Sequence, residues 1–151
     1  MQQLKAIPIE AIDIALAERS LKHFMQQAWH VVEPNTPLVW GRHLDAMVMH
    51  LEAVSRGTIQ NLVITIPPGA TKSLTCSVFW PAWTWINRPW IRWLTASNDS
   101  DLVLRDAVSC RDLINSDWYQ DRWSGVYHLA FDQNVKGWYK NDKKGFRTAV
   151  S

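Results

Sequence analysis

Apolar residues recur at helical spacing in two stretches of the N-terminal part of the chain. Between residues 10 and 32 the apolar positions lie three or four apart, which predicts one amphipathic helix that ends before Pro34 and Pro37. The same spacing over residues 44–54 predicts a second helix, closed by Gly57. We therefore expect residues 1–57 to form a helical segment that leads into the rest of the fold.

Beyond this segment the pattern changes to short apolar runs. Residues 62–66 form a continuous apolar run, which is typical of a strand buried on both faces. Residues 90–96 predict a second strand, and residues 127–131 are a possible third. Residues 138–140 and 146–150 flank a polar turn and predict a hairpin.

Helices are expected after the first two strands. Residues 72–80 have a helical pattern, and Pro81 predicts a kink or break in its continuation. Residues 97–101 are polar and acidic, as at a helix start, so a further helix should run to about residue 114. Alternation of strands and helices predicts an α/β fold with a largely parallel sheet and flanking helices. Because the sequence stops on a strand at Ser151, we expect this sheet to be incomplete at the C-terminus.

The composition excludes only a few classes of protein. The chain has 151 residues, 47% hydrophobic and 20% charged, which suits one globular domain. Its net charge of +2 does not by itself indicate nucleic-acid binding, and Cys76 and Cys110 form no metal-binding pattern. No apolar run approaches the length of a membrane span, so we expect no membrane association. The ten Trp residues are expected in the core and on half-buried surface.

The stretch IPPGATKS at residues 66–73 carries the main candidate chemistry. A phosphate-binding loop needs backbone N–H groups that converge on the phosphates, which requires small residues, here Gly69 and Ala70. It also needs a lysine that reaches the phosphates and a hydroxyl that holds Mg²⁺ at the start of the next helix. Lys72 and Ser73 are of the right type and in the right order.

Two positions depart from the usual pattern of such a loop. Ile66 and Thr71 occupy the places of its two glycines. A β-branched residue resists positive φ, so the loop should differ in detail from the common one. From this stretch alone, an ordinary strand–turn–helix with a solvated Lys72 remains an equal alternative.

Together with its surroundings the loop resembles a known family, the large terminase subunit of tailed bacteriophages, in the N-terminal part of its ATPase domain. The stretches that carry the resemblance are residues 37–46, 50–57, 61–73, 77–83, 95–97, 110–120 and 141–147. The resemblance runs from about residue 20 onward, and it implies a P-loop NTPase-like fold. Residues 58–151 would then be a partial ATPase core without the nuclease domain.

The resemblance also implies roles for particular residues. Terminases tolerate a Pro-Pro-Gly-x-x-Lys-Ser loop, so Gly69, Ala70, Thr71, Lys72 and Ser73 would form the Walker A phosphate loop. Ser73 would also bind Mg²⁺ through its hydroxyl.

Four further residues have assignments that rest on the resemblance alone. Trp40 would stack on the adenine of ATP, and His43 would contact its edge; both residues could instead fill space at the start of a helix. Arg105 and Arg111 are the candidates for an arginine that stabilises the transferred phosphoryl group across a subunit boundary. A solvated or structural role is the alternative for each arginine.

The function implied is the ATP-binding part of a motor that packages viral DNA. Its cofactors would be ATP and Mg²⁺. Its partners would be double-stranded DNA, a portal protein, a small terminase subunit and further copies in a homo-oligomeric ring. It would act in the cytoplasm of a bacterial host, on procapsids. The acidic strand and catalytic glutamate are expected beyond Ser151, so weak nucleotide binding and negligible hydrolysis are expected and enzymatic activity stays open.

Two alternatives stay open beside this one. The chain could be an inactive, truncated prophage remnant or an interaction module, or it could be another P-loop ATPase such as a helicase-like protein. The densest basic group comprises Lys136, Lys140, Lys143, Lys144 and Arg147, and we interpret it as a solvated hairpin tip rather than a DNA-binding surface.

Acidic residues of the helix after residue 97 offer no clear metal site. Asp99, Asp101, Asp106 and Asp112 share that helix. We expect Asp99, Asp106 and Asp112 to lie on its solvated face.

Overall fold

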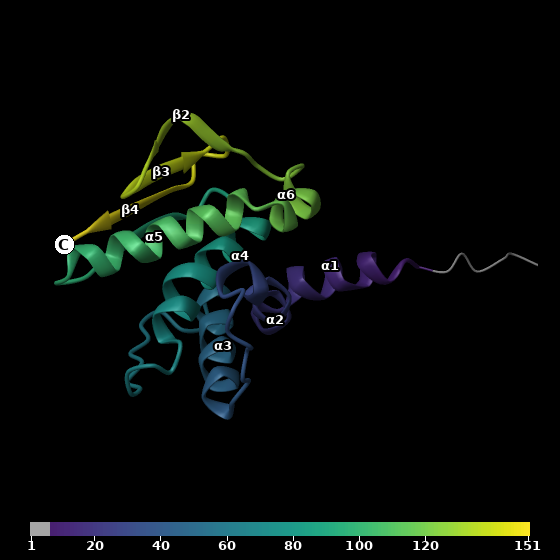
Figure 1. Cartoon of the computed structure of the whole chain (residues 1–151), viewed down its shortest axis with the longest axis horizontal. Coiled ribbons are helices and arrows are strands. Elements are labelled where there is room, and N and C mark those ends of the chain that lie inside the picture. The colour runs from purple at the N-terminus through teal and green to yellow at the C-terminus, as the bar shows by residue number, and fades with distance from the viewer. Residues whose placement is uncertain (1–6) are drawn as a thin grey trace, which may run out of the picture.

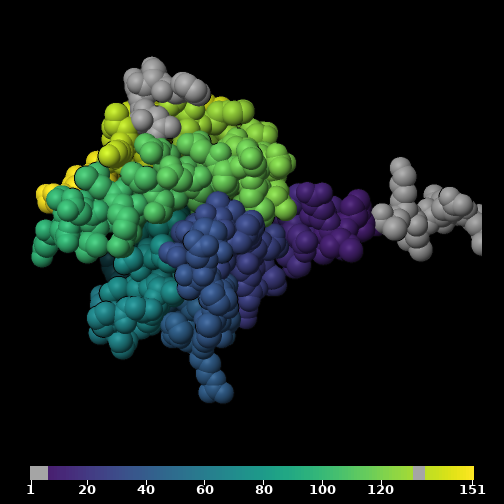
Figure 2. All heavy atoms as spheres, viewed as in Figure 1, coloured from purple at the N-terminus to yellow at the C-terminus, as the bar shows by residue number. Residues whose placement is uncertain are grey.

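The chain is arranged as a small sheet, one long helix beneath it and a group of helices below that helix (Figure 1). The computed structural model describes residues 7–151, apart from the side chains of residues 131–134. On the face drawn in Figure 2, the side chains of the long helix and of the N-terminal helices form a continuous surface. The fold is therefore mixed α/β, as predicted.

The N-terminal part contains three helices, where the sequence pattern predicted two. They are α1 (Ile9–Arg19), α2 (Leu21–Val32) and α3 (Arg42–Ser55). The prediction of one helix over residues 10–32 is wrong, because Ser20 is extended, with φ −138° and ψ 122°. The apolar spacing continues through this break, which is why the pattern did not reveal it. Helix α3 is confirmed, and Gly57 follows its end with a φ of 79°.

The helix after the loop continues through Pro81. Helical backbone begins at Lys72, passes through the π-helix η1 (Leu74–Phe79) and continues as α4 (Trp80–Asn87). Pro81 therefore does not break the helix, and the kink predicted as the other possibility stays a prediction. In an α-helix the N–H of residue 81 would donate to the carbonyl of Ser77, and proline has no N–H. Arg147 Nη1 donates to that carbonyl instead.

The sheet is mixed, and the prediction of a largely parallel sheet is wrong. Its strands are β1 (Arg92–Ala96), β2 (Leu129–Val135), β3 (Trp138–Asn141) and β4 (Phe146–Val150), in the order β1-β4-β3-β2. Only β1 and β4 pair in parallel. The short connections from β2 to β3 and from β3 to β4 leave room for hairpins alone, which makes both pairs antiparallel.

The run of residues 62–66 is not a strand of this sheet. Its backbone forms no hydrogen bond to another backbone group in the part of the chain that the structure describes. Leu62, Ile64 and Ile66 pack against the core, whereas Val63 is 89% exposed. The segment therefore alternates in burial like a half-buried strand, yet no neighbouring strand accompanies it.

Two helices connect β1 to β2. Helix α5 (Ser100–Asn115) confirms the prediction, and its N-cap is Asp99, whose Oδ1 accepts from the N–H groups of Asp101 and Leu102 at 2.9 and 3.2 Å. Helix α6 (Asp117–Trp123) was not predicted. The side-chain oxygen of its N-cap, Ser116, accepts from the backbone N–H of Tyr119 at 3.3 Å. The helix has only seven residues, so its sequence pattern is too short to predict it.

Aromatic side chains fill the core between the helical layers. Phe24 is fully buried, and its ring lies 5.8 Å from Trp118 and from Trp123, 6.3 Å from Tyr119 and 6.5 Å from Phe79. Nine of the ten Trp residues are buried or half-buried, as expected, and Trp90 is 57% exposed. The core draws on both the N-terminal helices and the elements after residue 58.

Candidate functional site

A cavity of about 560 Å³ opens beside the predicted phosphate loop. Four segments form its walls: the end of α2, the loop itself, the first turn of the following helix and the middle of α5. The lining residues are Val32, Glu33, residues 66–74, Arg105 and Ser109. All five residues of the predicted loop, Gly69 to Ser73, thus line one cavity.

The loop backbone is unusual at two residues. Gly69 has a φ of 81°, and Thr71 has a φ of 59°. Thr71 therefore adopts the left-handed conformation that its β-branched side chain disfavours, contrary to our expectation that it would resist it. Such strain persists only where the surrounding structure enforces it, and it is concentrated at functional sites.

The loop also leaves backbone donors free. The N–H groups of Thr71, Lys72 and Ser73 donate to no backbone or side-chain acceptor of residues 7–151, with the side chains of 131–134 left aside, and Pro68 and Gly69 form a turn. The Thr71 carbonyl accepts from the backbone N–H and the hydroxyl of Thr75, both at 2.9 Å, which fixes the first helical turn. A run of free N–H groups at a helix start is a suitable partner for an anion.

Lys72 and Ser73 lie at the start of this helix, and both are exposed. Lys72 forms no ion pair with any side chain that the structure describes. Cys76 lies one turn further on. Burial raises the pKa of its thiol, and the positive charge of Lys72 opposes that rise. The ammonium group of Lys72 is thus available to a ligand in the cavity.

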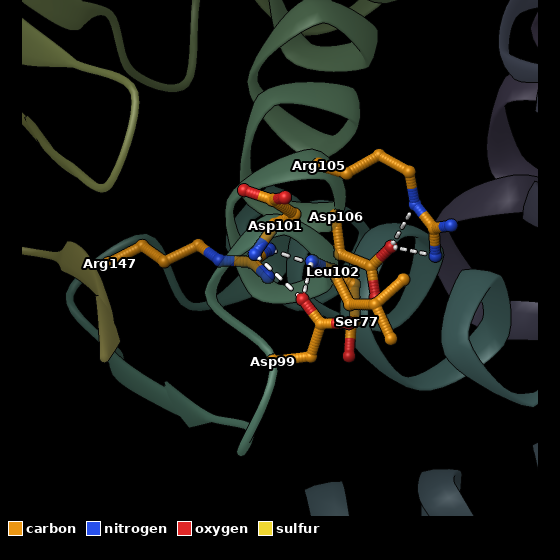
Figure 3. A network of polar contacts seen from close by, with 7 residues as sticks. All are labelled: Ser77, Asp99, Asp101, Leu102, Arg105, Asp106 and Arg147. Atoms are coloured by element: carbon orange, nitrogen blue, oxygen red, sulfur yellow. Dashed lines mark hydrogen bonds and ion pairs between the residues drawn. The ribbon is translucent and has the colours of Figure 1, made fainter. Parts of the chain in front are cut away.

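Two further charged residues, Arg105 and Glu33, line the cavity. Arg105 projects from α5, and its Nε and Nη2 donate to Asp106 Oδ1 at 3.1 and 2.9 Å (Figure 3). The Arg105 side chain is 59% exposed, whereas that of Asp106 is 10% exposed. Glu33 follows the last residue of α2 and is half-buried. The lining of the cavity therefore includes two cations, Lys72 and Arg105, and one carboxylate, that of Glu33.

A buried arginine supports the helix behind the cavity. Arg147 is 1% exposed and donates through Nη1 to the Ser77 carbonyl (Figure 3). Burial lowers the pKa of Arg147, but its interactions with Cys110 and Tyr139 outweigh that effect and raise the pKa. Arg147 therefore stays charged and joins β4 to the helix that begins in the loop.

Three of the predicted site residues lie away from this cavity. Trp40 and His43 are not among its lining residues. Trp40 Nε1 donates to Asp45 Oδ1 at 2.9 Å, and Lys22 Nζ lies 5.3 Å from the Trp40 ring centre. Hydrogen bonds from Lys22 and Trp40 lower the pKa of Asp45.

Arg111 is the third of these residues. It lies on α5, and its Nε is 3.5 Å from Asp112 Oδ1. Neither the adenine contacts nor a role for Arg111 gains support from this arrangement, and both stay predictions.

Two expectations about charged groups need correction. Asp106 is 7% exposed and therefore does not lie on the solvated face of α5. Arg147 is buried against Ser77 and does not belong to the exposed basic group at the hairpin, whereas Lys136, Lys143 and Lys144 are exposed. In the described part of the chain no group of three His, Cys, Asp or Glu side chains is placed to hold a metal ion.

Glu33 and Ser109 also line the cavity, and the sequence alone did not indicate either residue. Glu33 precedes Pro34, and the pattern there indicated only the end of a helix. Ser109 lies one turn of α5 beyond Arg105 and faces the same cavity. Residues four apart lie on the same face of a helix, so the spacing of Arg105 and Ser109 predicts that they face the same way. That spacing indicates a cavity residue only if Arg105 is known to face the loop.

Comparisons of the chain with protein-family models, with curated proteins and with solved structures gave no match. Across the described residues, no helix combines the length and apolar character needed to cross a membrane.

Proposed function

We propose that the cavity beside Gly69–Ser73 binds the phosphates of a nucleotide, with ATP and Mg²⁺ as the ligands. The observation that carries this proposal is the combination of free backbone N–H groups, a positive φ at both Gly69 and Thr71, and an unpaired Lys72 on one wall. Each feature alone is common, but together they form a concave, positively charged site with preorganised donors.

Each lining residue has a distinct part in this proposal. The N–H groups of the loop would hold the phosphate oxygens, and Lys72 would neutralise the outer phosphates. Arg105 would approach the same phosphates from α5 within one chain, after giving up its bond to Asp106. Because Arg105 lines the same cavity as the loop of its own chain, it does not need to act across a subunit boundary, as we first expected.

The carboxylate of Glu33 indicates that nucleotide binding depends on a divalent metal ion. A carboxylate on the wall of a phosphate site repels bare ATP, and a bound divalent cation removes that repulsion. Ser73 would supply a hydroxyl ligand to Mg²⁺, as predicted from its place in the loop. Magnesium should therefore strengthen nucleotide binding, and more so in the presence of Glu33.

At the level of biology, we propose that the chain is the ATP-binding, N-terminal portion of a phage terminase large subunit with a P-loop NTPase-like core. This proposal rests on the sequence resemblance together with the loop. Double-stranded DNA, a portal protein, a small terminase subunit and a homo-oligomeric ring would be its partners, in the host cytoplasm and at the procapsid. An inactive remnant that no longer binds nucleotide is the alternative.

Calorimetric titration of Mg·ATP into the chain and its Lys72→Ala variant tests the binding site. Losing a charged hydrogen-bond partner should weaken binding by about 10-fold to 100-fold. Lys136→Ala removes one exposed lysine outside the cavity and is the matched control, with no change expected. Equal affinities for the Lys72 variant and the wild type would reject the loop assignment.

A second comparison tests the role of Glu33. In EDTA, Glu33→Gln should bind ATP more tightly than the wild type, whereas with Mg²⁺ the two should be similar. If Glu33→Gln has no effect in EDTA, the carboxylate does not face the phosphates.

A further inference from the structure

The sheet has one covered face and one face that no helix of the described residues covers (Figure 1). Helix α5 lies along the covered face, where Tyr139 and Arg147 are 0% and 1% exposed. Successive side chains of a strand point to opposite faces. Lys140 and Phe146, the neighbours of these two residues in sequence, therefore lie on the open face.

The strand register aligns the open-face residues in two rows. Phe146 pairs with Arg92 on one side and with Lys140 on the other, so these three form the first row. Thr148 pairs with Leu94 and Trp138, which form the second row. The first row thus has an aromatic ring between two cations, and the second places another aromatic ring beside it.

The cations and rings already lie close together. The guanidinium carbon of Arg92 lies 5.5 Å from the centre of the Phe146 ring. A shallow pocket of about 320 Å³ opens here, and its lining includes Arg92, Lys140, Lys144, Trp138 and Phe146. Trp138, Lys140 and Phe146 are half-buried, so the sheet limits their freedom to move.

One carboxylate, Asp142, also lines this pocket. Its Oδ2 already has basic neighbours, with His128 Nδ1 at 3.7 Å and Lys143 Nζ at 3.9 Å. Among the described lining residues, Arg92, Lys140 and Lys144 therefore leave an excess of positive charge. This surface suits a ligand that combines negative charge with flat rings.

We propose that this open face of the sheet binds single-stranded nucleic acid. Lys140, Lys144 and Arg92 would contact phosphates, and unpaired bases would stack on Phe146 and Trp138. Stacking requires base faces that are accessible, and in a duplex those faces are covered by neighbouring base pairs. Aromatic residues on the open face of a sheet are a common device for binding unpaired bases. The site is separate from the loop cavity, with which it shares no lining residue.

Fluorescence anisotropy with a short fluorescein-labelled oligothymidylate tests the proposal on the full chain. Lys140→Gln and Lys144→Gln should each weaken binding by about threefold to fivefold and reduce the salt dependence by about one phosphate contact. Lys136→Gln removes the same charge from the turn between β2 and β3, outside the pocket lining, so affinity should stay nearly constant. Equal losses in all three variants would overturn the proposal in favour of diffuse charge attraction.

Further measurements separate stacking from charge and this site from the loop. Phe146→Leu should weaken binding at least about fivefold, because it removes the stacking ring and keeps an apolar side chain. Tighter binding of a duplex of the same length, or equal competition by free thymidine monophosphate, would overturn the proposal. Lys72→Ala should leave oligonucleotide affinity unchanged, whatever it does to ATP binding. Loss of oligonucleotide binding in that variant would move the site to the loop and reject this one.

Discussion

The aromatic core around Phe24 and the loop region around Thr71 are built in opposite ways. Four aromatic rings surround Phe24, and all three tyrosines of the chain are at most 2% exposed. The loop region instead combines an extended segment without a strand partner, free N–H groups and a strained Thr71. Stability is thus concentrated in one region, and groups free to bind a ligand are concentrated in the other.

Truncation in the core should have the largest effect. Phe24→Ala removes a fully buried ring, so the free energy of unfolding should fall by about 3–5 kcal/mol in urea denaturation. Val63→Ala, in the extended segment beside the loop, should change it by less than about 0.5 kcal/mol, because Val63 is 89% exposed. If the two variants lose similar amounts of unfolding free energy, stability is not concentrated in the aromatic core.

Alkaline titration examines the same core without mutation. Burial raises the pKa of Tyr119, Tyr127 and Tyr139, and the Tyr119 and Tyr127 hydroxyls lie 2.8 Å apart. Because the folded pKa exceeds the unfolded value of about 10, this contribution to stability is complete below pH 10 and is lost as the pH rises above it. Tyrosinate absorbance should therefore appear together with unfolding measured by circular dichroism. Gradual ionisation in the folded chain would show that the hydroxyls reach solvent.

Relief of strain in the loop should have a smaller effect of opposite sign. Thr71→Gly removes a left-handed β-branched residue and should stabilise the chain by about 0.5–1 kcal/mol, after the added entropy of glycine in the unfolded state. Ala70→Gly, at the adjacent residue without positive φ, should destabilise it by about 0.5–1 kcal/mol. Thermal unfolding of both variants measures the two changes in stability. If both variants are destabilised, Thr71 is not strained.

Alkylation of Cys76 should show the smallest effect and reports on the loop directly. Burial raises the pKa of this half-buried thiol, and the positive charge of Lys72 partly offsets that rise. A bound nucleotide would neutralise that charge, so Mg·ATP should slow modification by iodoacetamide about twofold to threefold, measured by mass spectrometry. Cys110, which is 1% exposed, is an internal control. Unchanged or faster labelling of Cys76 would contradict a nucleotide beside Lys72.

The sequence predicted those elements whose signals are local. Gly57, the Asp99 cap and the turn between β3 and β4 each mark a boundary through nearby residues, and the corresponding elements are present. The unpaired run of residues 62–66 was predicted wrongly as a strand of the sheet, because strand pairing depends on residues distant in sequence. Local propensity could not decide whether a partner strand lies beside it.

The candidate site was predicted in part for the same reason. Gly69 to Ser73 are contiguous, so their order alone indicated a phosphate loop. Arg105 was a candidate through the resemblance, but its place in the cavity wall, like that of Glu33, depends on the packing of α2 and α5. The break at Ser20 was hidden because the apolar spacing continues across it.

The bond between Arg147 and the Ser77 carbonyl has a consequence for the order in which the chain folds. It joins residues 70 apart, and it supplies the donor that Pro81 withholds from its own helix. During synthesis on the ribosome, that helix emerges well before the arginine that completes it. The helix that begins in the loop should therefore remain incompletely stabilised until β4 has been made, and closing so long a segment of chain should slow this step of folding.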